Sequence, residues 1–389
     1  MKKKIAILGS TGSIGVTLLN IIKKDKKNFE VLLLTANKNY KKLFKQAKVF
    51  NVKNIIITDK KSFKAAKNKI KKNKINIYNN FDNFNQIFTK KIDYVMSSIV
   101  GINGLLPTIE IIKYTKKIVI ANKESIICAW NLIQKELNKY KTEFIPVDSE
   151  HFSIWYALKN IQISKVKKIY LTASGGPLLN IPLNKFKNLK ISQILKHPSW
   201  KMGKKITVDS STMMNKVFEI IEAKKIFNIS YSKLNILIHP QSYLHAIIKF
   251  NNGLIKIIAH DTTMEIPIFN TIYDETNYEI KSKDLDIKKL NNLDLMKVEN
   301  KRFPLVKILN KLPNNNSLFE TAVVSANDEL VDLYLKKQIK YKRIGEILLK
   351  ITNKKEILNL KKISPNKIFS IIKINEYVRL KIKAMVYNI

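Results

Sequence analysis

Short hydrophobic runs alternate with longer amphipathic segments along the first 147 residues of the chain. Hydrophobic side chains recurring every three or four positions predict helices over 14–24 and 39–49. The apolar runs between such segments predict strands at 5–8, 31–35, 54–58, 94–97, 118–121 and 144–147. Strands that alternate with helices form βαβ units, so this part is predicted to be α/β with a Rossmann-like, doubly wound parallel sheet. The segment 60–80, rich in Lys and Asn, is predicted to be a solvated helix.

The pattern changes at about residue 148. A mixed region follows, in which a helix over 211–227 is flanked by strands predicted at 168–173, 235–239, 243–250 and 254–260. Residues 271–300 are charged and weakly periodic, and the tail from 301 is helical throughout. These shifts predict a parallel-sheet domain over 1–147, a central α+β domain over 148–275, a linker over 276–300 and an all-helical domain over 301–389.

The composition adds a large positive charge. Lys and Arg number 71 against 30 Asp and Glu, which gives a net charge of +41 and invites a nucleic-acid interpretation. Arginine, the preferred residue for bidentate contacts with bases and phosphates, occurs only three times, and Lys, Ile and Asn are abundant. That combination is typical of an AT-rich coding sequence, so we expect no nucleic-acid partner.

A single cysteine, Cys128, excludes an intrachain disulfide framework and a Cys-rich zinc site. The apolar run at the N-terminus stops at Gly9, too soon for a secretory signal, and the apolar runs are too short to span a bilayer. We therefore expect a cytoplasmic protein with no membrane association.

The motif Gly9-Ser-Thr-Gly-Ser-Ile-Gly15 follows the first predicted strand and opens a helix. Glycines there let the backbone approach a pyrophosphate, and the helix N-terminus supplies N–H donors, so the motif predicts dinucleotide binding. A Gly-rich turn without a ligand is the alternative. The second strand ends in Thr35-Ala-Asn-Lys-Asn39, without the acid that holds the ribose of NAD, and Lys38 suits the 2′-phosphate of NADP.

Two short motifs follow later strands of this sheet. In Ala121-Asn-Lys-Glu-Ser125, a Lys and an Asn at a strand tip suit a cofactor and a charged substrate, although an ordinary helix start has the same composition. In Val147-Asp-Ser-Glu-His151, an extended backbone would turn Asp148 and Glu150 to one side, where they suit Mg²⁺ or Mn²⁺. A helix start capped by Asp148 or Ser149 is the alternative.

Polar side chains also gather in the central region. Residues 210–212 resemble a helix N-terminus, after which Asn215, Lys216 and Glu219 form one polar face, with Glu219 a candidate third carboxylate for the metal. The segment 173–177 offers a hydroxyl and free amides to an oxyanion. Residues 195–205, with His197 and Trp200, are predicted to form a lid, whereas His239 and His245 are interpreted as structural or interfacial.

These motifs together resemble the 1-deoxy-D-xylulose 5-phosphate reductoisomerase family. The resemblance runs in order through almost the whole chain, at 9–15, 121–125, 147–151, 174–177, 197–219, 239–242 and 325–329. It implies an N-terminal NADPH domain, a central catalytic domain, a C-terminal helical domain and a homodimer. It also implies NADPH and a divalent metal, Mg²⁺ or Mn²⁺, as cofactors, and a phosphorylated sugar as substrate.

The resemblance further implies roles for individual residues. The metal ligands fall on Asp148, Glu150 and Glu219, and Lys123 and Glu150 are candidate proton carriers. Substrate contacts fall on Lys123, Ser149, Glu150, Ser174, His197, Ser210, Asn215, Lys216 and Glu219. Cofactor contacts fall on Thr11, Gly12, Ser13, Ile14, Asn37, Lys38, Asn39, Asn122, Glu124 and Gly203.

The implied reaction rearranges the carbon skeleton of 1-deoxy-D-xylulose 5-phosphate and reduces the product with NADPH to 2-C-methyl-D-erythritol 4-phosphate. The chain departs from the family at Asn37 and Ala173, where glycine is usual, and at 261–267, which lacks an arginine. Two alternatives compete with this function. One is a metal-independent NADP-dependent aldehyde or semialdehyde dehydrogenase, which would not need three carboxylates to bind a metal. The other is a basic nucleic-acid-binding protein.

Overall fold

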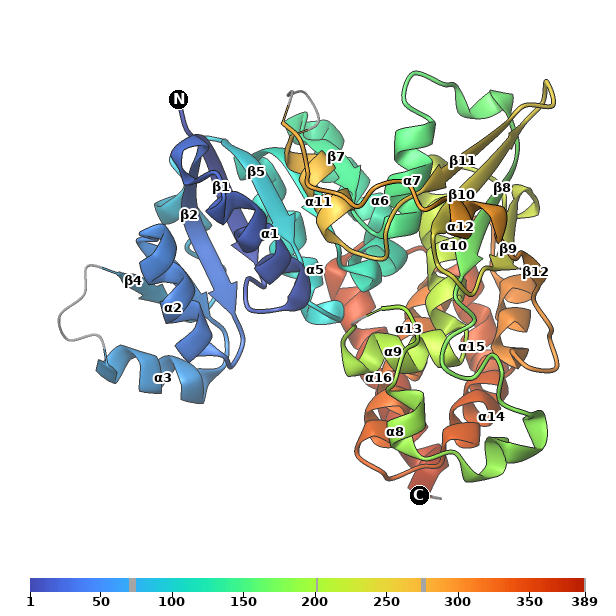
Figure 1. Cartoon of the computed structure of the whole chain (residues 1–389). Helices are drawn as coiled ribbons and strands as arrows, with labels where there is room; N and C mark the ends of the chain where they lie inside the picture. The colour runs from blue at the N-terminus through green and yellow to red at the C-terminus, as the bar shows by residue number, and fades with distance from the viewer. Residues whose placement is uncertain (70–74, 201, 274–277, 388–389) are drawn as a thin grey trace. The chain divides into compact units, whose positions relative to one another are not determined.

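Seven parallel strands form one sheet in the N-terminal part of the chain, in the order β4-β3-β2-β1-β5-β6-β7 (Figure 1). Their bounds are β1 Lys3–Leu8, β2 Phe29–Ala36, β3 Asn54–Ile57, β4 Asn76–Tyr78, β5 Ile92–Ser97, β6 Thr115–Ile120 and β7 Glu143–Pro146. The chain runs outward from β1 to β4 and then returns to β5 on the other side of β1. In such sheets ligands bind at the carboxyl ends of the two strands where the order reverses, here β1 and β5.

The computed structural model describes residues 1–69, 75–200, 202–273 and 278–387 and divides into two units. Unit 1 comprises Met1–Ser125, Leu132–Asp148 and Met264–Ile280, and unit 2 comprises Ile126–Asn131, Ser149–Thr263 and Lys281–Ile389. The segment from Met264 therefore groups with the parallel sheet, whereas the predicted catalytic domain extended to 275. The three-domain division remains a prediction. Within the described residues, no helix is both long and apolar enough to cross a membrane.

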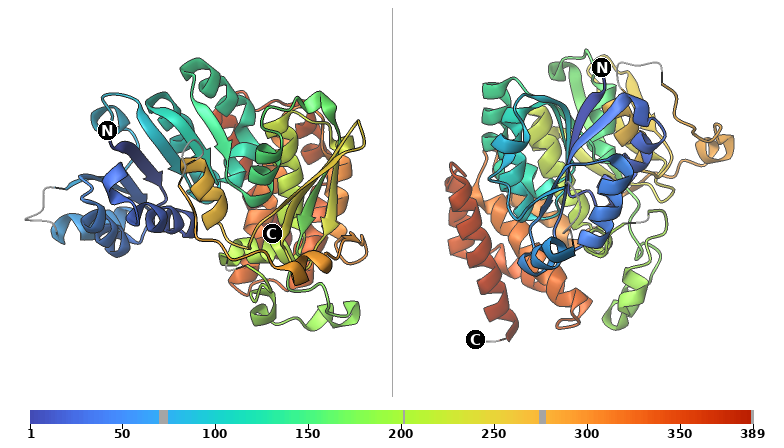
Figure 2. Two further views of the ribbon diagram at one scale, coloured as in Figure 1. Left: turned by 45° about the horizontal axis from the view of Figure 1, so that its top comes forward. Right: turned by 90° about the vertical axis from the view of Figure 1, so that its left-hand side faces the viewer.

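Helices accompany the parallel strands of unit 1 (Figures 1 and 2). They are α1 Ser13–Lys23, α2 Tyr40–Phe50, α3 Lys60–Lys69, α4 Phe84–Ile87, α5 Leu105–Ile111, α6 Lys123–Tyr140 without its residues Ile126–Asn131, and α11 Glu265–Ile272. Helix α11 packs against α1, and its Thr271 hydroxyl lies 2.8 Å from the Tyr94 hydroxyl of β5. A late segment of the chain thus completes the core of the N-terminal sheet.

Unit 2 contains a mixed five-stranded sheet in the order β11-β10-β8-β9-β12. Its strands are β8 Val166–Ala173, β9 Leu234–Ile238, β10 Leu244–Phe250, β11 Ile255–Ala259 and β12 Met296–Lys297. Apolar side chains of α7 (Ser149–Ala157) and α10 (Met214–Phe227) pack against one face of β8 and β10. From Lys168 to Leu171 the side chains of β8 alternate between partly exposed and buried positions, which is the pattern of a sheet with one covered face.

The remainder of unit 2 is helical. Its helices are α8 Ile191–Ile194, α9 Lys204–Ser211, α12 Ile287–Asn291, α13 Leu318–Leu335, α14 Tyr341–Ile351, α15 Lys355–Asn359 and α16 Ile368–Tyr387, with 3-10 helices η5 Leu183–Asn188 and η7 Pro304–Lys311. Helices α13 and α16 run side by side, as the orange and red ribbons of Figures 1 and 2 show. The predicted fold class, a parallel-sheet α/β part followed by a mixed part and a helical tail, is confirmed.

Three local predictions need correction. The segment 60–80 is not one helix, because α3 ends at Lys69 and β4 adds an edge strand; residues 70–74 lie outside the described residues. The helix predicted over 211–227 begins three residues later, as α10 at Met214, and residues 210–211 end α9 instead of beginning a helix, because Met213 adopts a left-handed conformation (φ 66°) between the two. The predicted linker contains α12 and β12, and β12 pairs with β9 through a contact that a local pattern does not encode.

Candidate active site

The glycine motif forms the tight turn between β1 and α1. Gly9 has φ +86°, and a Cβ atom at Gly15 would lie 2.5 Å from the Cα of Ser10, so both positions require glycine. The side chain of Gln46 holds the turn from α2, because its Nε2 donates to the Ser10 carbonyl at 2.8 Å and its Oε1 accepts from the Ser10 hydroxyl at 2.8 Å. Gly12 is the N-cap of α1 and no side chain caps this end, which leaves the first N–H groups of α1 for an anion.

The end of β2 lies beside this turn, since the Thr35 hydroxyl accepts a 2.8 Å hydrogen bond from the Gly9 N–H. Residues Asn37, Lys38 and Asn39 follow and are exposed. Asn37 donates to the Thr58 hydroxyl at 2.9 Å, and Asn39 caps α2 by accepting from the Lys42 N–H at 3.2 Å. The exposed Lys38 side chain is a cation that this strand end offers to a ligand.

Asn122 occupies the N-cap of α6, so the helix-start interpretation of 121–125 is correct for the backbone. Its Oδ1 accepts a 2.6 Å hydrogen bond from the Ser125 N–H, while its Nδ2 donates to the carbonyls of Ile99 and Gly101. The side chain is buried and joins the start of α6 to the loop after β5. Lys123, the next residue, forms an ion pair of 2.5 Å with Asp148.

Three carboxylates converge where the chain enters α7. Asp148 is the residue before this helix, Glu150 lies in its first turn and Glu219 lies on α10. Each offers one oxygen, and these oxygens lie within 4.8 Å of one another. The backbone at Ser149–Glu150 is helical rather than extended, so the convergence depends on α10 and not on strand alternation. Three carboxylate oxygens at this spacing fit a hard divalent cation such as Mg²⁺ or Mn²⁺.

Lys216 lies among these acids. Its Nζ is 2.7 Å from Glu150 and forms a second ion pair with Glu219, and the side chain of Asn215 donates to Glu219. Burial alone would lower the pKa of Lys216, but the charges of Glu150 and Glu219 outweigh burial and raise its pKa. The ammonium group therefore stays charged and offsets the mutual repulsion of the carboxylates.

A second polar cluster joins Ser174, His197 and Ser210. The Nε2 of His197 lies 3.0 Å from the Ser174 hydroxyl and 3.2 Å from the Ser210 hydroxyl. Its Nδ1 accepts hydrogen bonds from the backbone N–H groups of Ser199 and Trp200, so in the neutral ring the proton is on Nε2. Burial lowers the pKa of His197 to about 4. Two hydroxyls and one ring N–H in this arrangement suit an oxyanion such as a phosphate.

The other two histidines of interest are buried. His239 places Nδ1 2.9 Å from the carbonyl of Asp294, and His245 stacks on His260 with ring centroids 3.7 Å apart. Trp200, from the predicted lid, meets His245 edge to face at 6.0 Å. The structural interpretation of both histidines agrees with these contacts. Residue 201 of the predicted lid lies outside the described residues.

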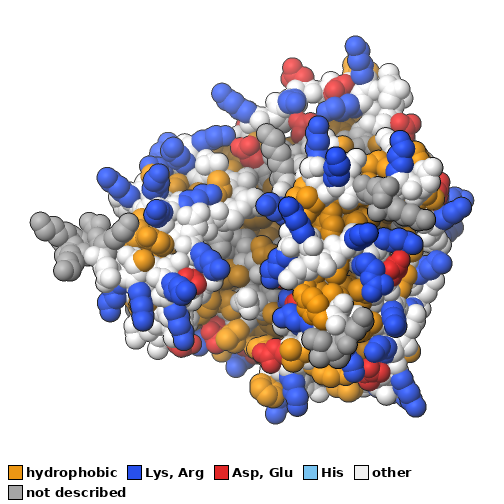
Figure 3. Space-filling model, turned by 90° about the horizontal axis from the view of Figure 1, so that it is seen from below, with side chains coloured by type: hydrophobic (Ala, Val, Ile, Leu, Met, Phe, Trp, Pro, Cys, Tyr) orange, Lys and Arg blue, Asp and Glu red, His pale blue; other side chains and the backbone are white. Residues whose placement is uncertain are grey.

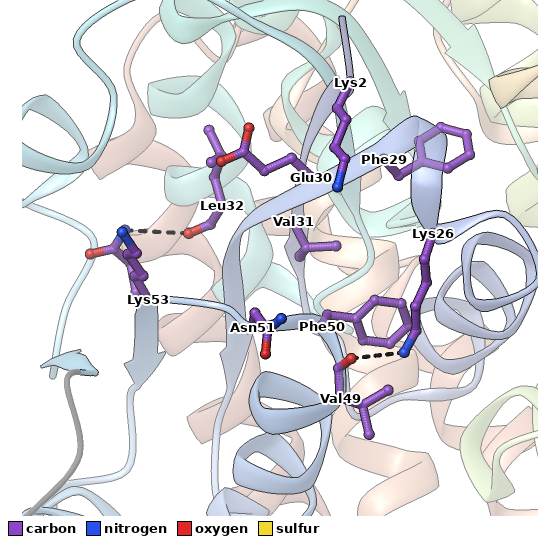
Figure 4. A pocket seen from close by; sticks show the side chains of 11 residues that line it. Lys2, Lys26, Phe29, Glu30, Val31, Leu32, Val49, Phe50, Asn51 and Lys53 are labelled. Carbon is purple, nitrogen blue, oxygen red and sulfur yellow. Dashed lines mark hydrogen bonds between the residues drawn. The ribbon is translucent and has the colours of Figure 1, made fainter.

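A cavity of about 490 Å³ in unit 1 is a different site. Its lining comes from the starts of β1 to β3 and the end of α2, and it includes Lys2, Lys26, Phe29 and Phe50 (Figure 4). Lys26 already donates to the Val49 carbonyl at 3.0 Å. The cavity lies at the amino ends of the strands, whereas dinucleotides bind at the carboxyl ends, so it is not the cofactor site.

The structure thus places the predicted residues in groups. The glycine turn, the end of β2 and the start of α6 belong to unit 1, whereas Gly203, at the N-cap of α9, belongs to unit 2. The sequence did not indicate the supporting residues, such as Gln46 behind the glycine turn. Arg302 is another, since it donates to the carbonyls of Leu178 and Ile181 behind the 174–177 turn. More than 100 residues separate Arg302 from Leu178 and Ile181, so no local sequence pattern could have indicated this contact.

Comparisons with known proteins show which family the chain resembles over its length. Three family models match the chain: "1-deoxy-D-xylulose 5-phosphate reductoisomerase" at residues 5–130, its C-terminal domain at 144–227, and "DXP reductoisomerase C-terminal domain" at 261–381. A 1-deoxy-D-xylulose 5-phosphate reductoisomerase of Pelagibacter ubique is 60% identical over 385 residues, which cover 98% of this chain and 99% of the relative. The enzyme of the same name from Wolbachia pipientis wMel is 38% identical over 89% of each chain.

Solved structures are also similar. The reductoisomerase of Zymomonas mobilis in complex with NADPH superposes with a TM-score of 0.88 at 28% identity, covering 100% of both chains. A reductoisomerase in complex with NADPH, fosmidomycin and magnesium gives a TM-score of 0.90 at 27% identity, covering 99% of this chain and 98% of the other. Since the family models and these relatives span nearly the whole sequence, the chain belongs to the 1-deoxy-D-xylulose 5-phosphate reductoisomerase family.

Proposed function

We propose that this protein converts 1-deoxy-D-xylulose 5-phosphate to 2-C-methyl-D-erythritol 4-phosphate, using NADPH and a divalent metal. The observation that carries the proposal is the convergence of Asp148, Glu150 and Glu219, with ligand oxygens within 4.8 Å of one another. A metal-independent dehydrogenase has no use for such a cluster. When bound, the metal supplies Lewis acidity to the substrate oxygens and NADPH supplies the hydride.

The residues of the chain divide this work among them. Ser174, His197 and Ser210 offer two hydroxyls and one N–H to the phosphate, and Asn215 and Lys216 add an amide and a positive charge. Binding the phosphate fixes the reacting carbons relative to the carboxylates, which lowers the entropic part of the barrier.

Lys123 and Glu150 are proposed to move protons at the substrate oxygens. Each forms an ion pair with another residue of the site: Lys123 pairs with Asp148, and Glu150 pairs with Lys216. Ser149 donates to Glu150 at 2.6 Å and fixes the orientation of that carboxylate. Ser149 is therefore proposed to contact the substrate and to position Glu150.

The cofactor contacts are proposed to come from the glycine turn at Thr11–Ile14, from Asn37, Lys38 and Asn39, and from Asn122, Glu124 and Gly203. Support comes from the uncapped start of α1 beside the turn and from the exposed Lys38 at the end of β2. The reductoisomerases similar to this chain include complexes with NADPH.

A spectrophotometric assay of NADPH oxidation tests the function directly. NADPH oxidation is followed with 1-deoxy-D-xylulose 5-phosphate after EDTA treatment, and then after Mn²⁺ or Mg²⁺ is restored. Metal-dependent oxidation with formation of the methylerythritol phosphate is expected. Oxidation that persists in EDTA would favour the dehydrogenase, and NADPH binding without turnover would direct attention to Asn37, Ala173 and residues 261–267.

We further propose a cytoplasmic homodimer. Strand β11 is an edge strand with exposed Leu254, Ile255 and Ile257 near its start, and a second copy would cover this apolar edge. Sedimentation of the wild type and of an Ile257→Lys variant tests the dimer, which the variant is expected to weaken. The single cysteine, Cys128, is buried and suits a reducing compartment.

Nucleic acid is proposed not to be a partner. Blue side chains are scattered over the face shown in Figure 3 and do not form one stripe.

The three functional parts are proposed to be the NADPH domain (1–147), the catalytic domain (148–275) with a lid at about 195–205, and the helical domain (301–389) after a linker (276–300).

A further inference from the structure

A run of polar residues lies inside the helical part of unit 2 and has no role in the chemistry proposed above. It is Ser325-Ala-Asn-Asp-Glu329, in the middle of α13, and every one of these residues is buried. Buried polar groups are costly unless they are paired. Their partners therefore indicate what the run stabilises.

The partners lie on α9, the helix that carries Ser210. The Nδ2 of Asn327 donates to Oδ1 of Asp209 at 2.7 Å, and both side chains are almost completely buried. Lys205, in the first turn of α9, places its Nζ 3.2 Å from Asp209 and 2.9 Å from Asp328. Two adjacent residues of α13 thus hold one face of α9 at both of its ends.

Asp209 immediately precedes Ser210, and successive residues of a helix are about 100° apart around its axis. The Asp209 side chain points into the protein toward α13, while the Ser210 hydroxyl lies 3.2 Å from Nε2 of His197. Fixing the rotation of α9 at Asp209 therefore fixes the position of the Ser210 hydroxyl.

The other side of α9 is restricted as well. A Cβ atom at Gly176 would lie 2.8 Å from the Ser210 carbonyl, so the turn that carries Ser174 packs tightly against the end of α9. The Tyr341 hydroxyl donates to the Ser211 carbonyl at 2.8 Å. The end of α9 lies between the Ser174 turn and the C-terminal helices, with little freedom to shift.

Behind α13, one of the three arginines of the chain supports the network. Arg379 of α16 lies 3.5 Å from Asp328 and donates to Glu329 at 2.8 Å. The planar guanidinium presents several N–H donors in a fixed geometry and can contact both carboxylates. The orientation of Asp328 toward Lys205 is thus set from a third helix.

We infer that Asn327 and Asp328 are positioning residues, which hold α9 through Asp209 and Lys205 so that the Ser210 hydroxyl, with His197 and Ser174, meets the phosphate of the substrate. The inference rests on the proposed function, because it assigns the Ser174–His197–Ser210 cluster to the substrate phosphate. It gives the polar run of α13 a role in phosphate affinity, besides its role in folding.

The test is a double-mutant cycle between Asn327→Leu and Ser210→Ala. For each variant the affinity for inorganic phosphate is measured by calorimetry, along with kcat and KM for 1-deoxy-D-xylulose 5-phosphate and the affinity for NADPH. Asn327→Leu is expected to raise the phosphate Kd and the substrate KM about 10-fold, since small misplacements of a binding group are costly. Its NADPH affinity should change less than its phosphate affinity, because among the proposed cofactor contacts only Gly203 lies at α9. In the Ser210→Ala background the same change should alter phosphate affinity less than about twofold.

Asn131→Leu is the matched control. Asn131 donates to the Pro365 carbonyl at 3.0 Å in the same unit, and the loss of this hydrogen bond should leave phosphate affinity unchanged. Lys205→Met is a second variant that weakens the attachment of α9 to α13. The Lys205 side chain is partly exposed, so this variant is expected to fold even if Asn327→Leu does not. The effects of Lys205→Met and Ser210→Ala on phosphate affinity should also be non-additive.

Equal losses of phosphate affinity in the wild-type and Ser210→Ala backgrounds would overturn the inference, as would a lower melting temperature with KM unchanged. Either result, obtained with an active wild type, leaves the proposed function intact. A wild type that neither turns over 1-deoxy-D-xylulose 5-phosphate nor binds phosphate would overturn the proposed function and the inference with it.

Discussion

The Nε2 atom of His197 lies 3.0 Å from the hydroxyl of Ser174, although 22 residues separate the two along the chain. The Nδ1 atom of the same ring accepts the N–H groups of Ser199 and Trp200, so Nε2 is left to donate. The tautomer of His197 is therefore set by its own loop, and the ring presents a hydrogen-bond donor to the pair of serines.

Replacing His197 tests this donor. A hydrogen bond to a charged group contributes about 1.5–3 kcal/mol, which corresponds to about 10- to 100-fold in affinity. His197→Asn loses the Nε2 position and is expected to raise the substrate KM within that range. His197→Gln, whose amide nitrogen can reach the same position, should retain more affinity. Equal KM values for wild type and His197→Asn would show that the ring does not contact the phosphate.

The low pKa of His197 predicts how stability depends on pH. The ordinary value is 6.5, and burial lowers the pKa of His197 in the folded protein to about 4. Between these values the unfolded chain binds a proton that the folded chain does not, so this residue makes the protein less stable as pH falls from 6.5 to 4. NMR titration should find this ring neutral at pH 5.5, and His197→Gln should flatten the pH dependence of unfolding. A ring that titrates near 6.5 would contradict the prediction.

Glu219 is expected to be necessary for metal binding. Changes to residues that only support metal ligands cost about 10- to 100-fold in affinity, so removing a ligand charge in Glu219→Gln should weaken Mn²⁺ binding at least about 10-fold. Glu222→Gln is the control, because Glu222 lies one turn further along α10 and is equally buried. Mn²⁺ affinity measured by calorimetry separates the two variants. Similar affinities for both would remove Glu219 from the metal site.

Two glycines of the turn are predicted to have different roles, Gly12 in binding NADPH and Gly15 in folding. A Cβ at Gly12 would have only the Gly9 carbonyl oxygen within 4 Å, at 3.4 Å, so Gly12→Ala should fold and lose NADPH affinity through its approach to the pyrophosphate. Gly15→Ala should instead destabilise the protein, since its Cβ would meet Ser10 at 2.5 Å. Thermal unfolding and NADPH titration measure the two effects. Normal NADPH affinity in Gly12→Ala would place the pyrophosphate elsewhere.

Lys38 is predicted to select NADPH over NADH. Lys38→Glu should raise the Kd for NADPH about 10-fold and leave that for NADH nearly unchanged, because only NADPH carries the 2′-phosphate. Lys41→Glu, at another exposed lysine, changes the net charge equally and serves as the control. If both variants weaken NADPH binding to the same extent, general attraction rather than a contact at Lys38 explains the preference.

The sequence predicted the strands and the glycine turn of the N-terminal sheet well. Alternating apolar runs located the strands of the N-terminal sheet, and the glycine motif located its cofactor turn, because both depend on neighbours a few residues apart. Errors arose where a distant partner decides the local structure. Strand β4 has only three residues and exists because it pairs with β3, and the left-handed Met213 that divides α9 from α10 lies in a buried setting.

By itself the sequence determined the residue types of the chemistry: the acids at 148, 150 and 219, the serines and histidine for an oxyanion, and Lys38 for a dinucleotide phosphate. Tertiary structure alone decided which of these meet. Glu219 joins Glu150 across 69 positions of the chain because α7 and α10 pack on the same sheet, and Asn327 reaches Asp209 across 118. Such contacts depend on the packing of whole elements, since no local spacing fixes the distance between side chains that far apart in sequence.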